Sequence, residues 1–267
     1  EWYLQRVCAE TGPGGIRAVD YLDLHYYPQG DGIAGLDNDV NAGEQPAVQA
    51  RRMRSLRELY DASYVSESWI GQTGYPVPNL LPRARAAIAA RCPGVKLALT
   101  EYKWGPDNGI SSAVAQAELL AIFGREGVSY ATRWVAPEVG TLAEQAFRLY
   151  LNYDGSHTRV TGDSIPASST LPDSVGAYAV ERANGTLQLL LFNRGFTASD
   201  VNVDLSGTSA LSYSGWRLQS SGYSGIAAAV PIAGNSINLT QVPALSATLL
   251  VIQRASAGGS IFSNGFE

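Results

Sequence analysis

The chain has 267 residues, of which 45% are hydrophobic and only 16% charged, so it can bury a substantial core and is too apolar for a disordered protein. Its formal net charge is -5, and it contains neither a basic run nor zinc-like Cys/His spacing, so we expect no nucleic acid partner. No apolar stretch reaches the roughly 18 residues that cross a bilayer, so we expect no membrane partner.

The first part of the chain alternates apolar strands with segments of helical spacing, which predicts βα units and a parallel sheet. Helical segments are expected at residues 2–10, 48–60, 80–91 and 113–125, and strands at 18–27, 95–104 and 128–135. Each of the three strands ends in aromatic and charged residues.

The first of these strands, VDYLDLHYY, is polar on one face only. Side chains alternate along a strand, so Asp23, His25 and Tyr27 share one face while Leu22 and Leu24 share the other. A doubly wound sheet is usually apolar on both faces, whereas a barrel strand can direct polar residues into the lumen near its carboxyl end, where active sites lie. The pattern therefore favours a (β/α)₈-type barrel.

The second strand, LALTEYKWGPDNG, places Glu101 where the apolar run ends. A carboxylate at a barrel mouth, with Tyr102, Trp104 and Trp134 nearby, suits sugar chemistry, because flat rings stack on pyranose faces and a carboxylate can attack an anomeric carbon. Strand ends also commonly carry charge, so a salt-bridged Glu among core tryptophans fits the same spacing. Spacing alone leaves both interpretations open.

After LNYDGSH the composition changes to Ser, Gly, Thr and Val, with short alternating strands expected near residues 174–181, 186–193, 200–205, 215–219, 236–240 and 246–253. Asn184-Gly185 is a strong signal for a two-residue hairpin turn. These features predict an antiparallel β-sandwich. We therefore expect a partial barrel over 1–155, a β-sandwich over 156–254 and a flexible tail over 255–267.

Two further patterns bear on bound ions and on the redox state. Cys8 and Cys92 are compatible with a disulfide, but two buried thiols are favoured. The acidic loop LDNDVNAGE, residues 36–44, resembles a calcium loop, yet its Gly falls one place late and the distal Glu is missing, which favours an ordinary surface loop. We expect no metal and no cofactor.

Five blocks carry a family resemblance: YLDLHYYPQ (21–29), YDASYVSESWI (60–70), LTEYKWG (99–105), AQAELLAIFGREGVSYATRW (115–134) and AFRLYLNYDG (146–155). With the trailing sandwich, they resemble glycoside hydrolase family 44, whose members are endo-acting β-glucanases and xyloglucanases. The resemblance covers residues 2–254 but corresponds to the C-terminal portion only of a family member, and the start at Glu1, without Met or a signal-peptide pattern, is read as an internal cut.

The resemblance implies a (β/α)₈ TIM-type barrel packed on a β-sandwich, and hydrolysis with retention of anomeric configuration by two glutamates. Matched to LTEYKWG, Glu101 is the expected nucleophile. Trp69 and Trp134 match aromatics that line the glucan cleft. The remaining expected substrate-site residues are Tyr102, His25 and Tyr27, the first two through hydrogen bonding. Lys103 departs from the Asn expected at that place, so a polar contact there is not carried over.

No residue of this chain matches the acid/base glutamate of the family, which follows an earlier barrel strand. Glu67 and Glu138 are the in-chain alternatives, and we expect both to be cleft-rim or structural residues. A retaining mechanism needs a proton donor about 5 to 5.5 Å from the nucleophile. The activity and stability of the chain on its own are therefore left open.

The function implied is that of a secreted, bacterial-type hydrolase that cleaves internal β-1,4-glucosidic bonds of plant glucans, either cellulose-type or xyloglucan. The alternative is a non-catalytic glycan-binding remnant that uses Trp69, Trp134 and sandwich aromatics such as Tyr213, Trp216 and Tyr223. A third interpretation, in which the sandwich only buttresses the barrel, is favoured beyond residue 174 because its aromatics are scattered. The preferred glucan and the oligomeric state are not predicted.

Overall fold

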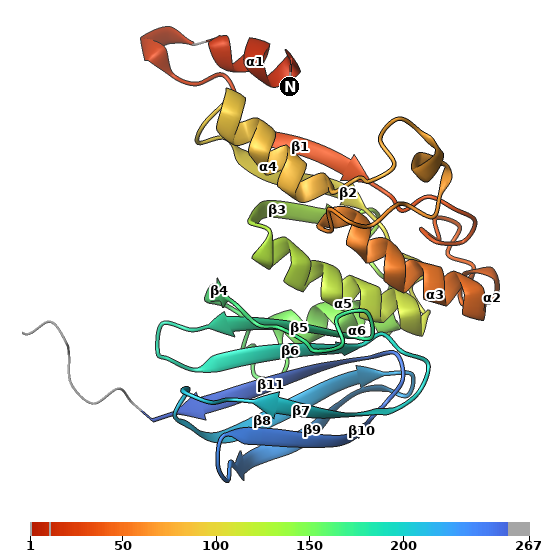
Figure 1. The fold of residues 1–267 in the computed structure, drawn as a ribbon, viewed down its shortest axis with the longest axis vertical. Helices are drawn as coiled ribbons and strands as arrows, with labels where there is room; N and C mark the ends of the chain where they lie inside the picture. Colours follow the sequence, from red (N-terminus) through yellow and green to blue (C-terminus); the bar gives the residue numbers. More distant parts are fainter. Residues whose placement is uncertain (1, 11, 256–267) are drawn as a thin grey trace, which may run out of the picture. The chain divides into compact units, whose positions relative to one another are not determined.

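The computed structural model describes residues 2–10 and 12–255, and contacts divide the chain into two compact units, Glu1–Phe147 and Arg148–Glu267 (Figure 1). The division falls inside one continuous helix, α6 (Leu142–Leu151), so it does not test the domain boundary expected at residue 155, which stays a prediction. The tail expected at 255–267 lies, apart from residue 255, outside the described residues. Within the described part of the chain, no helix is long and apolar enough to span a membrane.

The first unit is built on a parallel sheet of three strands in the order β1-β2-β3. These are β1 (Tyr21–Tyr26), β2 (Lys96–Tyr102) and β3 (Val128–Arg133). The connecting helices are α2 (Val40–Gly43), α3 (Pro46–Ser55), α4 (Leu80–Arg91) and α5 (Ile110–Arg125), and α1 (Trp2–Ala9) comes before β1. Short 3₁₀ turns lie at Pro13–Gly15, Leu56–Leu59 and Trp69–Gln72. The expected α/β class with parallel strands is confirmed.

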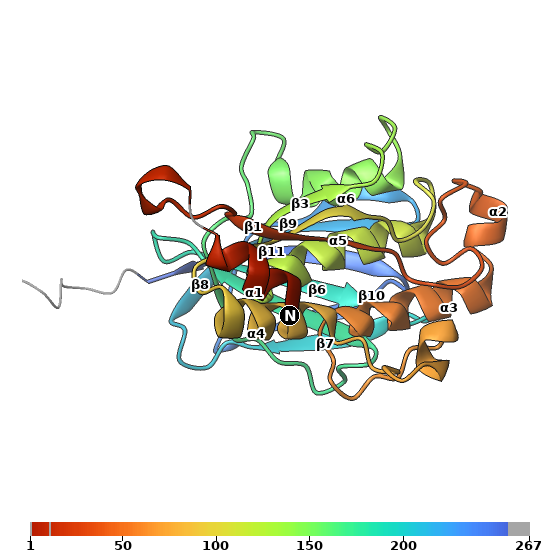
Figure 2. The same cartoon turned by 90° about the horizontal axis from the view of Figure 1, so that it is seen from above.

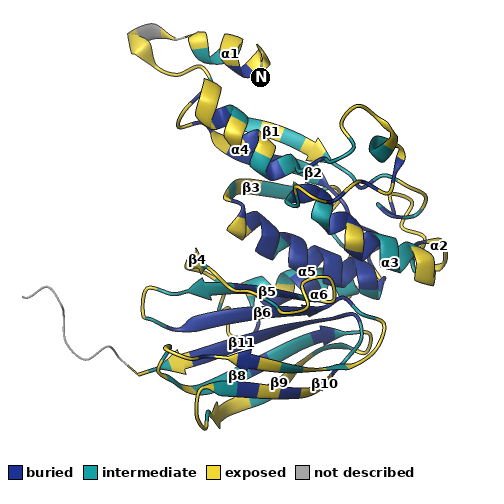
Figure 3. Ribbon diagram, viewed as in Figure 1, coloured by how far each residue is buried: buried dark blue, intermediate teal, exposed yellow. Residues whose placement is uncertain are grey.

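One face of this sheet is covered and the other is open. Leu97 and Leu99 on β2 are 2% and 0% exposed, and α5 packs against β3 and α3. Helix α5 is apolar almost all round and is buried from Ser111 to Phe123 apart from one residue (Figure 3). On the other face, Tyr21 and Asp23 line a shallow hollow together with Ala98, Thr100 and Tyr130. The polar face predicted for β1 is therefore real.

The two cysteines form a disulfide, so the expectation of two buried thiols is wrong. Cys8 lies in α1 and Cys92 caps the end of α4, with their Cα atoms 5.7 Å apart. Helix α1 lies beside α4 in both views (Figure 1, Figure 2). The pairing arises from the packing of two helices whose cysteines are 84 residues apart, a separation that carries no pairing signal in the sequence.

The second unit is a two-sheet antiparallel sandwich, as predicted. Its larger sheet has the order β4-β5-β6-β11-β8-β9 and its smaller sheet pairs β10 with β7. The strands are β4 (Asp163–Ile165), β5 (Val175–Glu181), β6 (Leu187–Asn193), β7 (Ser199–Asp204), β8 (Ala210–Gln219), β9 (Gly222–Pro231), β10 (Ser236–Val242) and β11 (Ser246–Arg254). Leucines of β6 and Leu250 of β11 pack against Val203 of β7 and Ile237 of β10 in one shared core.

The sandwich differs from the sequence prediction in several details, among them the short strand β4, which was not predicted, and the start of β8 at Ala210 in place of residue 215. The Asn184-Gly185 hairpin forms, but its loop is longer than two residues, because the Arg182 amide pairs with the Thr186 carbonyl and Gly185 takes a positive φ of 82°. Strand β9 was not predicted, since its sequence GYSGIAAAVP is rich in residues with low β propensity. It forms because Ser220 and Ser221 turn the chain directly back onto β8.

Candidate active site

The side chain of Glu101 reaches the open face of the sheet because β2 contains a β-bulge. On the β1 side, Leu24 pairs with Leu99 and His25 pairs with Glu101, so Thr100 is an extra residue. On the β3 side, the register shifts over the same stretch. Strict alternation would place Glu101 with the buried Leu99 on the helix-covered face. A bulge adds one residue and thereby redirects the next side chain, a device found beside active sites.

Two residues from the end of β1 meet Glu101. The Tyr27 hydroxyl donates a hydrogen bond of 2.7 Å to Glu101 Oε1, and His25 Nδ1 lies 3.5 Å from Oε2. Burial, and then the hydrogen bond to Glu101, raise the pKa of Tyr27, so the phenol keeps its proton and remains a donor. The Glu101 side chain is still 27% exposed, which leaves the carboxylate accessible. The structure thus brings Glu101, His25 and Tyr27 together.

Tyr102 is not brought to this site. The same bulge turns its side chain to the helix-covered face, where it is 1% exposed and meets Phe123 edge-on at 5.0 Å. Its hydroxyl accepts a hydrogen bond of 3.0 Å from Gln116. Lys103 is also buried, and this burial lowers the pKa of its ammonium group. The expected hydrogen bonding of Tyr102 therefore takes place within the core, with a residue of α5.

Trp69 is connected to Glu101 through a short chain of hydrogen bonds. It begins the 3₁₀ turn Trp69–Gln72, which Ser68 caps by accepting a bond from the Ile70 amide. The indole donates to Gln29 Oε1 at 3.2 Å, and the Gln29 amide donates to the Tyr27 carbonyl at 2.9 Å. The side chain of Trp69 is 62% exposed, so its ring is available to a ligand. Gln29 was not singled out from the sequence, although it closes the block YLDLHYYPQ.

Trp134 lies at the carboxyl end of β3 on a segment held by a buried ion pair. Its backbone amide donates to the Tyr102 carbonyl at 2.9 Å, and its side chain is 47% exposed. The Arg133 guanidinium donates to the Val135 carbonyl at 2.7 Å and to Asp107 Oδ1 at 2.5 Å, and both charged side chains are buried. Sequence reasoning missed this pair, because its members come from different strand ends and nothing in their spacing links them.

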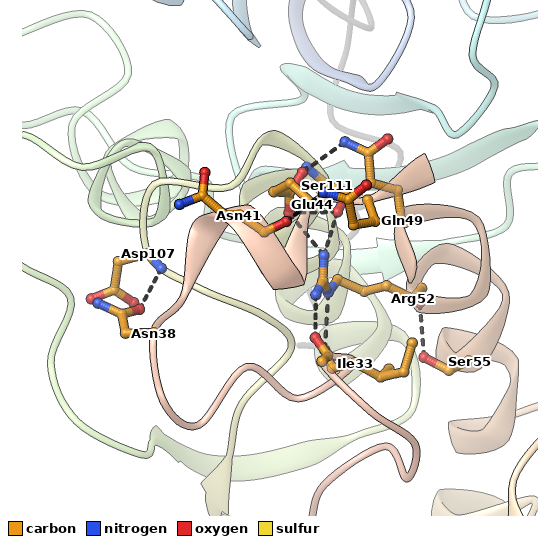
Figure 4. Close-up of polar contacts among 11 residues, drawn as sticks. Ile33, Asn38, Asn41, Glu44, Gln49, Arg52, Ser55, Asp107 and Ser111 are labelled. Atoms are coloured by element: carbon orange, nitrogen blue, oxygen red, sulfur yellow. Dashed lines mark hydrogen bonds and ion pairs between the residues drawn. The ribbon is translucent and has the colours of Figure 1, made fainter. Parts of the chain in front are cut away.

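The segment that follows β1 is fixed by a buried arginine on α3. Arg52 is fully buried and donates to the carbonyls of Gly32 at 2.6 Å and Ile33 at 2.9 Å (Figure 4). It also donates to Glu44 at 2.8 Å and to the Ser111 hydroxyl at 2.6 Å. Burial lowers the pKa of Arg52 and the pairing with Glu44 opposes that shift. The network ties the segment after Tyr27 to the start of α5.

Of the two in-chain glutamates considered as proton donors, Glu67 does not have that character. Glu67 accepts two hydrogen bonds of 2.7 Å from Arg54, which lower the pKa of its carboxyl to about 2, and Tyr64 donates a third. A general acid needs a raised pKa, so Glu67 is ionised where it would have to carry a proton. Glu138 is exposed in the segment after β3. Within the described residues, no group of three or more His, Cys, Asp or Glu side chains is placed to hold a metal ion.

The three aromatics of the second unit that were singled out from the sequence, Tyr213, Trp216 and Tyr223, serve in packing. Trp216 lies against Tyr153 with ring centroids 4.7 Å apart, and the Tyr223 hydroxyl donates to the Tyr153 carbonyl at 2.7 Å. Arg148 of α6 lies 5.1 Å from the centre of the Tyr223 ring, and Tyr213 packs against the sandwich core. These contacts hold the end of α6 on the sheet. They do not form a row of exposed platforms for a sugar chain.

Comparison with known proteins finds matches in glycoside hydrolase family 44 by sequence and by structure. A model of glycoside hydrolase family 44 matches residues 1–30. Endoglucanase A of Paenibacillus lautus is 30% identical over 262 residues, which is 96% of this chain and 37% of that protein. The chain therefore spans little more than a third of this relative.

Solved structures agree with this match. CelM2, a bifunctional glucanase-xylanase from a metagenome library, superimposes with a TM-score of 0.85 at 34% identity, over 95% of this chain and 47% of that one. A family 44 xyloglucanase of Paenibacillus polymyxa, solved with xyloglucan, has a TM-score of 0.83 at 29% identity, over 95% of this chain and 50% of that one. The likeness covers both units of the chain but only about half of each structure.

Proposed function

Because the chain is a portion of a glycoside hydrolase family 44 protein, we propose that it carries the nucleophile of a retaining enzyme that cleaves internal β-1,4-glucosidic bonds of plant glucans. The observation that carries the proposal is the placement of Glu101. Its carboxylate lies at the carboxyl end of a parallel strand, is held by Tyr27 and faces the open side of the sheet. Catalytic groups of (β/α)₈ enzymes lie at this end of the strands.

In the first step, a Glu101 oxygen attacks the anomeric carbon and forms a glycosyl ester, while the bond from that carbon to the leaving oxygen breaks. The bonding pair goes to the leaving oxygen, which takes a proton from a second carboxylic acid. Water then attacks the anomeric carbon of the glycosyl ester and gives a proton to the same second carboxylate, while the bond from that carbon to the Glu101 oxygen breaks and Glu101 leaves ionised. Tyr27 keeps Oε1 oriented throughout, and His25 lies beside Oε2.

The second carboxylic acid is proposed to lie outside these residues. Glu67 is ionised by Arg54, and no position of the chain resembles the acid/base glutamate of the family. We also infer that the three parallel strands belong to a closed (β/α)₈ barrel. In the described part of the chain, β1 and β3 each pair on one side only, and the polar face of the sheet is open as a barrel lumen would require.

The substrate class proposed is a β-1,4-linked glucan chain such as cellulose-type glucan or xyloglucan. Trp69 in the 3₁₀ turn and Trp134 after β3 are exposed, and flat rings stack on the faces of pyranose sugars. Relatives named as an endoglucanase and as a xyloglucanase solved with xyloglucan support this class. The Cys8–Cys92 disulfide supports a secreted protein, because such bonds persist in oxidising compartments.

The test is reducing-end release from xyloglucan and carboxymethylcellulose, with the complete reading frame that encodes this chain. Glu101→Gln is expected to abolish turnover while binding to the glucan persists, and Glu67→Gln is the matched control that retains activity. In Glu101→Gly, azide is expected to restore cleavage and to give an α-glycosyl azide, because the small anion occupies the place of the carboxylate. Full turnover by Glu101→Gln would refute the nucleophile assignment.

A further inference from the structure

Thr100, the extra residue of the β2 bulge, forms hydrogen bonds through its amide, hydroxyl and carbonyl groups with side chains of the two neighbouring strands. The Thr100 amide donates to Asp23 Oδ1 at 3.0 Å, and the Thr100 hydroxyl donates to Asp23 Oδ2 at 2.5 Å. The Thr100 carbonyl accepts a hydrogen bond from the Thr132 hydroxyl. A bulge residue loses its regular ladder partners, so its amide and carbonyl need others. Here Asp23 of β1 and Thr132 of β3 provide them.

This arrangement fixes the backbone immediately before Glu101. The peptide group that joins Thr100 to Glu101 contains the carbonyl that Thr132 holds. A change in that peptide plane would move the Glu101 carboxylate away from Tyr27 and His25. Catalytic side chains must be held within about half an ångström of their working geometry, and a displacement of about 1 Å can slow a reaction about 100-fold.

We propose that Asp23 and Thr132 are positioning residues that clamp the bulge at Thr100 and so hold Glu101 in its attacking orientation. This inference rests on the proposed function, because it assigns the two residues to the nucleophile of that reaction. Both Asp23 oxygens accept hydrogen bonds from Thr100, and His25 Nε2 lies 3.8 Å from Oδ2. The carboxylate therefore acts on Glu101 through the backbone at Thr100. The two hydrogen bonds of Asp23 hold Thr100 in place, and the negative charge of the carboxylate is not required for this.

Isosteric variants separate geometry from charge. In Asp23→Asn, the amide oxygen can accept from the Thr100 amide, and the NH₂ group can donate to the Thr100 hydroxyl, so the clamp survives without its charge. In Asp23→Ala both bonds are lost. Thr132→Val loses the bond to the Thr100 carbonyl and Thr132→Ser keeps it. Thr208→Val is the matched control, because it removes a hydroxyl-to-carbonyl bond of 2.7 Å in the second unit.

The measurement is covalent inactivation of the complete enzyme by a deoxyfluoro aryl cellobioside, which accumulates as the ester of the nucleophile. The first-order rate constant of labelling does not depend on how many sites are active, so unfolded protein does not alter it, and the final extent of labelling gives the amount of folded enzyme. We expect Asp23→Ala to slow labelling per site by about 10- to 100-fold and Thr132→Val by about 10-fold. The inhibitor's binding constant should stay unchanged, because Trp69 and Trp134 are untouched. Asp23→Asn, Thr132→Ser and Thr208→Val should stay within about threefold of wild type.

Two results would overturn the clamp while leaving the proposed function intact. One is unchanged labelling per site in Asp23→Ala, and the other is an Asp23→Asn variant as slow as Asp23→Ala, which would make the role one of charge. Peptide mapping of the label separates the two proposals, since a wild-type enzyme that is not labelled on Glu101 overturns both. If Asp23→Ala does not fold, equal rates in Thr132→Val and Thr132→Ser refute the clamp.

Discussion

Reducing the Cys8–Cys92 disulfide is expected to destabilise the first unit by a calculable amount. The bond closes a loop across a sequence separation of 84 residues, and the chain-entropy relation gives about 4.5 kcal/mol for such a loop at room temperature. Helix α1 has few other anchors, since Leu4 is its single buried residue and contributes about 2 kcal/mol. Domains are stable by only about 5–15 kcal/mol in total, so the expected loss is a large fraction of the whole.

The assay is urea unfolding followed by tryptophan fluorescence, with and without reductant. Four of the five tryptophans lie in the first unit, and one of them, Trp104, is 1% exposed, so the signal reports mainly on this unit. The chain has only two cysteines, so a reductant can act on one bond alone. The free energy of unfolding of a Cys8→Ser/Cys92→Ser variant should equal that of the reduced wild type and should not change when reductant is added. An oxidised wild type no more stable than this variant would refute the reasoning.

Three smaller perturbations test the polar contacts of the first unit. Asp107→Ala should lower the free energy of unfolding by about 3 kcal/mol because it leaves the buried Arg133 without its ion-pair partner. In a double-mutant cycle, adding Arg133→Met should restore part of this loss. Arg54 holds the pKa of Glu67 near 2 in the folded state, below its ordinary value of 4.5. The stability that this pair contributes to the fold is therefore present above pH 4.5 and is lost as the pH falls toward 2. Urea unfolding at about pH 6 and about pH 3 should therefore show a steeper loss for wild type than for Glu67→Gln, by about 0.5 kcal/mol because the pair is partly exposed. Glu58→Ala should cost about 1–3 kcal/mol because it leaves the Tyr26 hydroxyl without its acceptor and removes one hydrogen bond of Ser66, whereas Glu58→Gln should cost less, as measured by thermal unfolding.

The sequence predicts the strands of the first unit well because their apolar runs are long and end sharply. Alternation also identifies the polar face of β1, with Asp23 and His25 exposed and Leu22 and Leu24 less so. The family resemblance points to Glu101, and the structure places His25 and Tyr27 beside it. The catalytic and sugar-binding roles of these residues remain predictions until they are tested.

Other features could not be predicted because they depend on contacts between distant segments. The β2 bulge needs Asp23 and Thr132, which come from different strands, so no local pattern reveals that Tyr102 turns into the core. The disulfide depends on how α1 and α4 pack. Strand β9 depends on its neighbour β8 more than on its own composition. In each case tertiary packing overrides the local signal.

The bulge also determines what the insertion or deletion of one codon would do to strand β2. A strand's side chains alternate with a period of two, so one inserted codon exchanges the two faces of everything that follows unless a bulge absorbs the extra residue. Deleting Thr100 would restore regular pairing between β1 and β2 and would make Glu101 the direct successor of Leu99, so Glu101 would stay on the open face and Tyr102 in the core. A single-codon deletion at this place would therefore remove the bulge and keep the carboxylate at the strand end. Natural variants that lack this residue should keep both the sheet and the face on which the carboxylate lies.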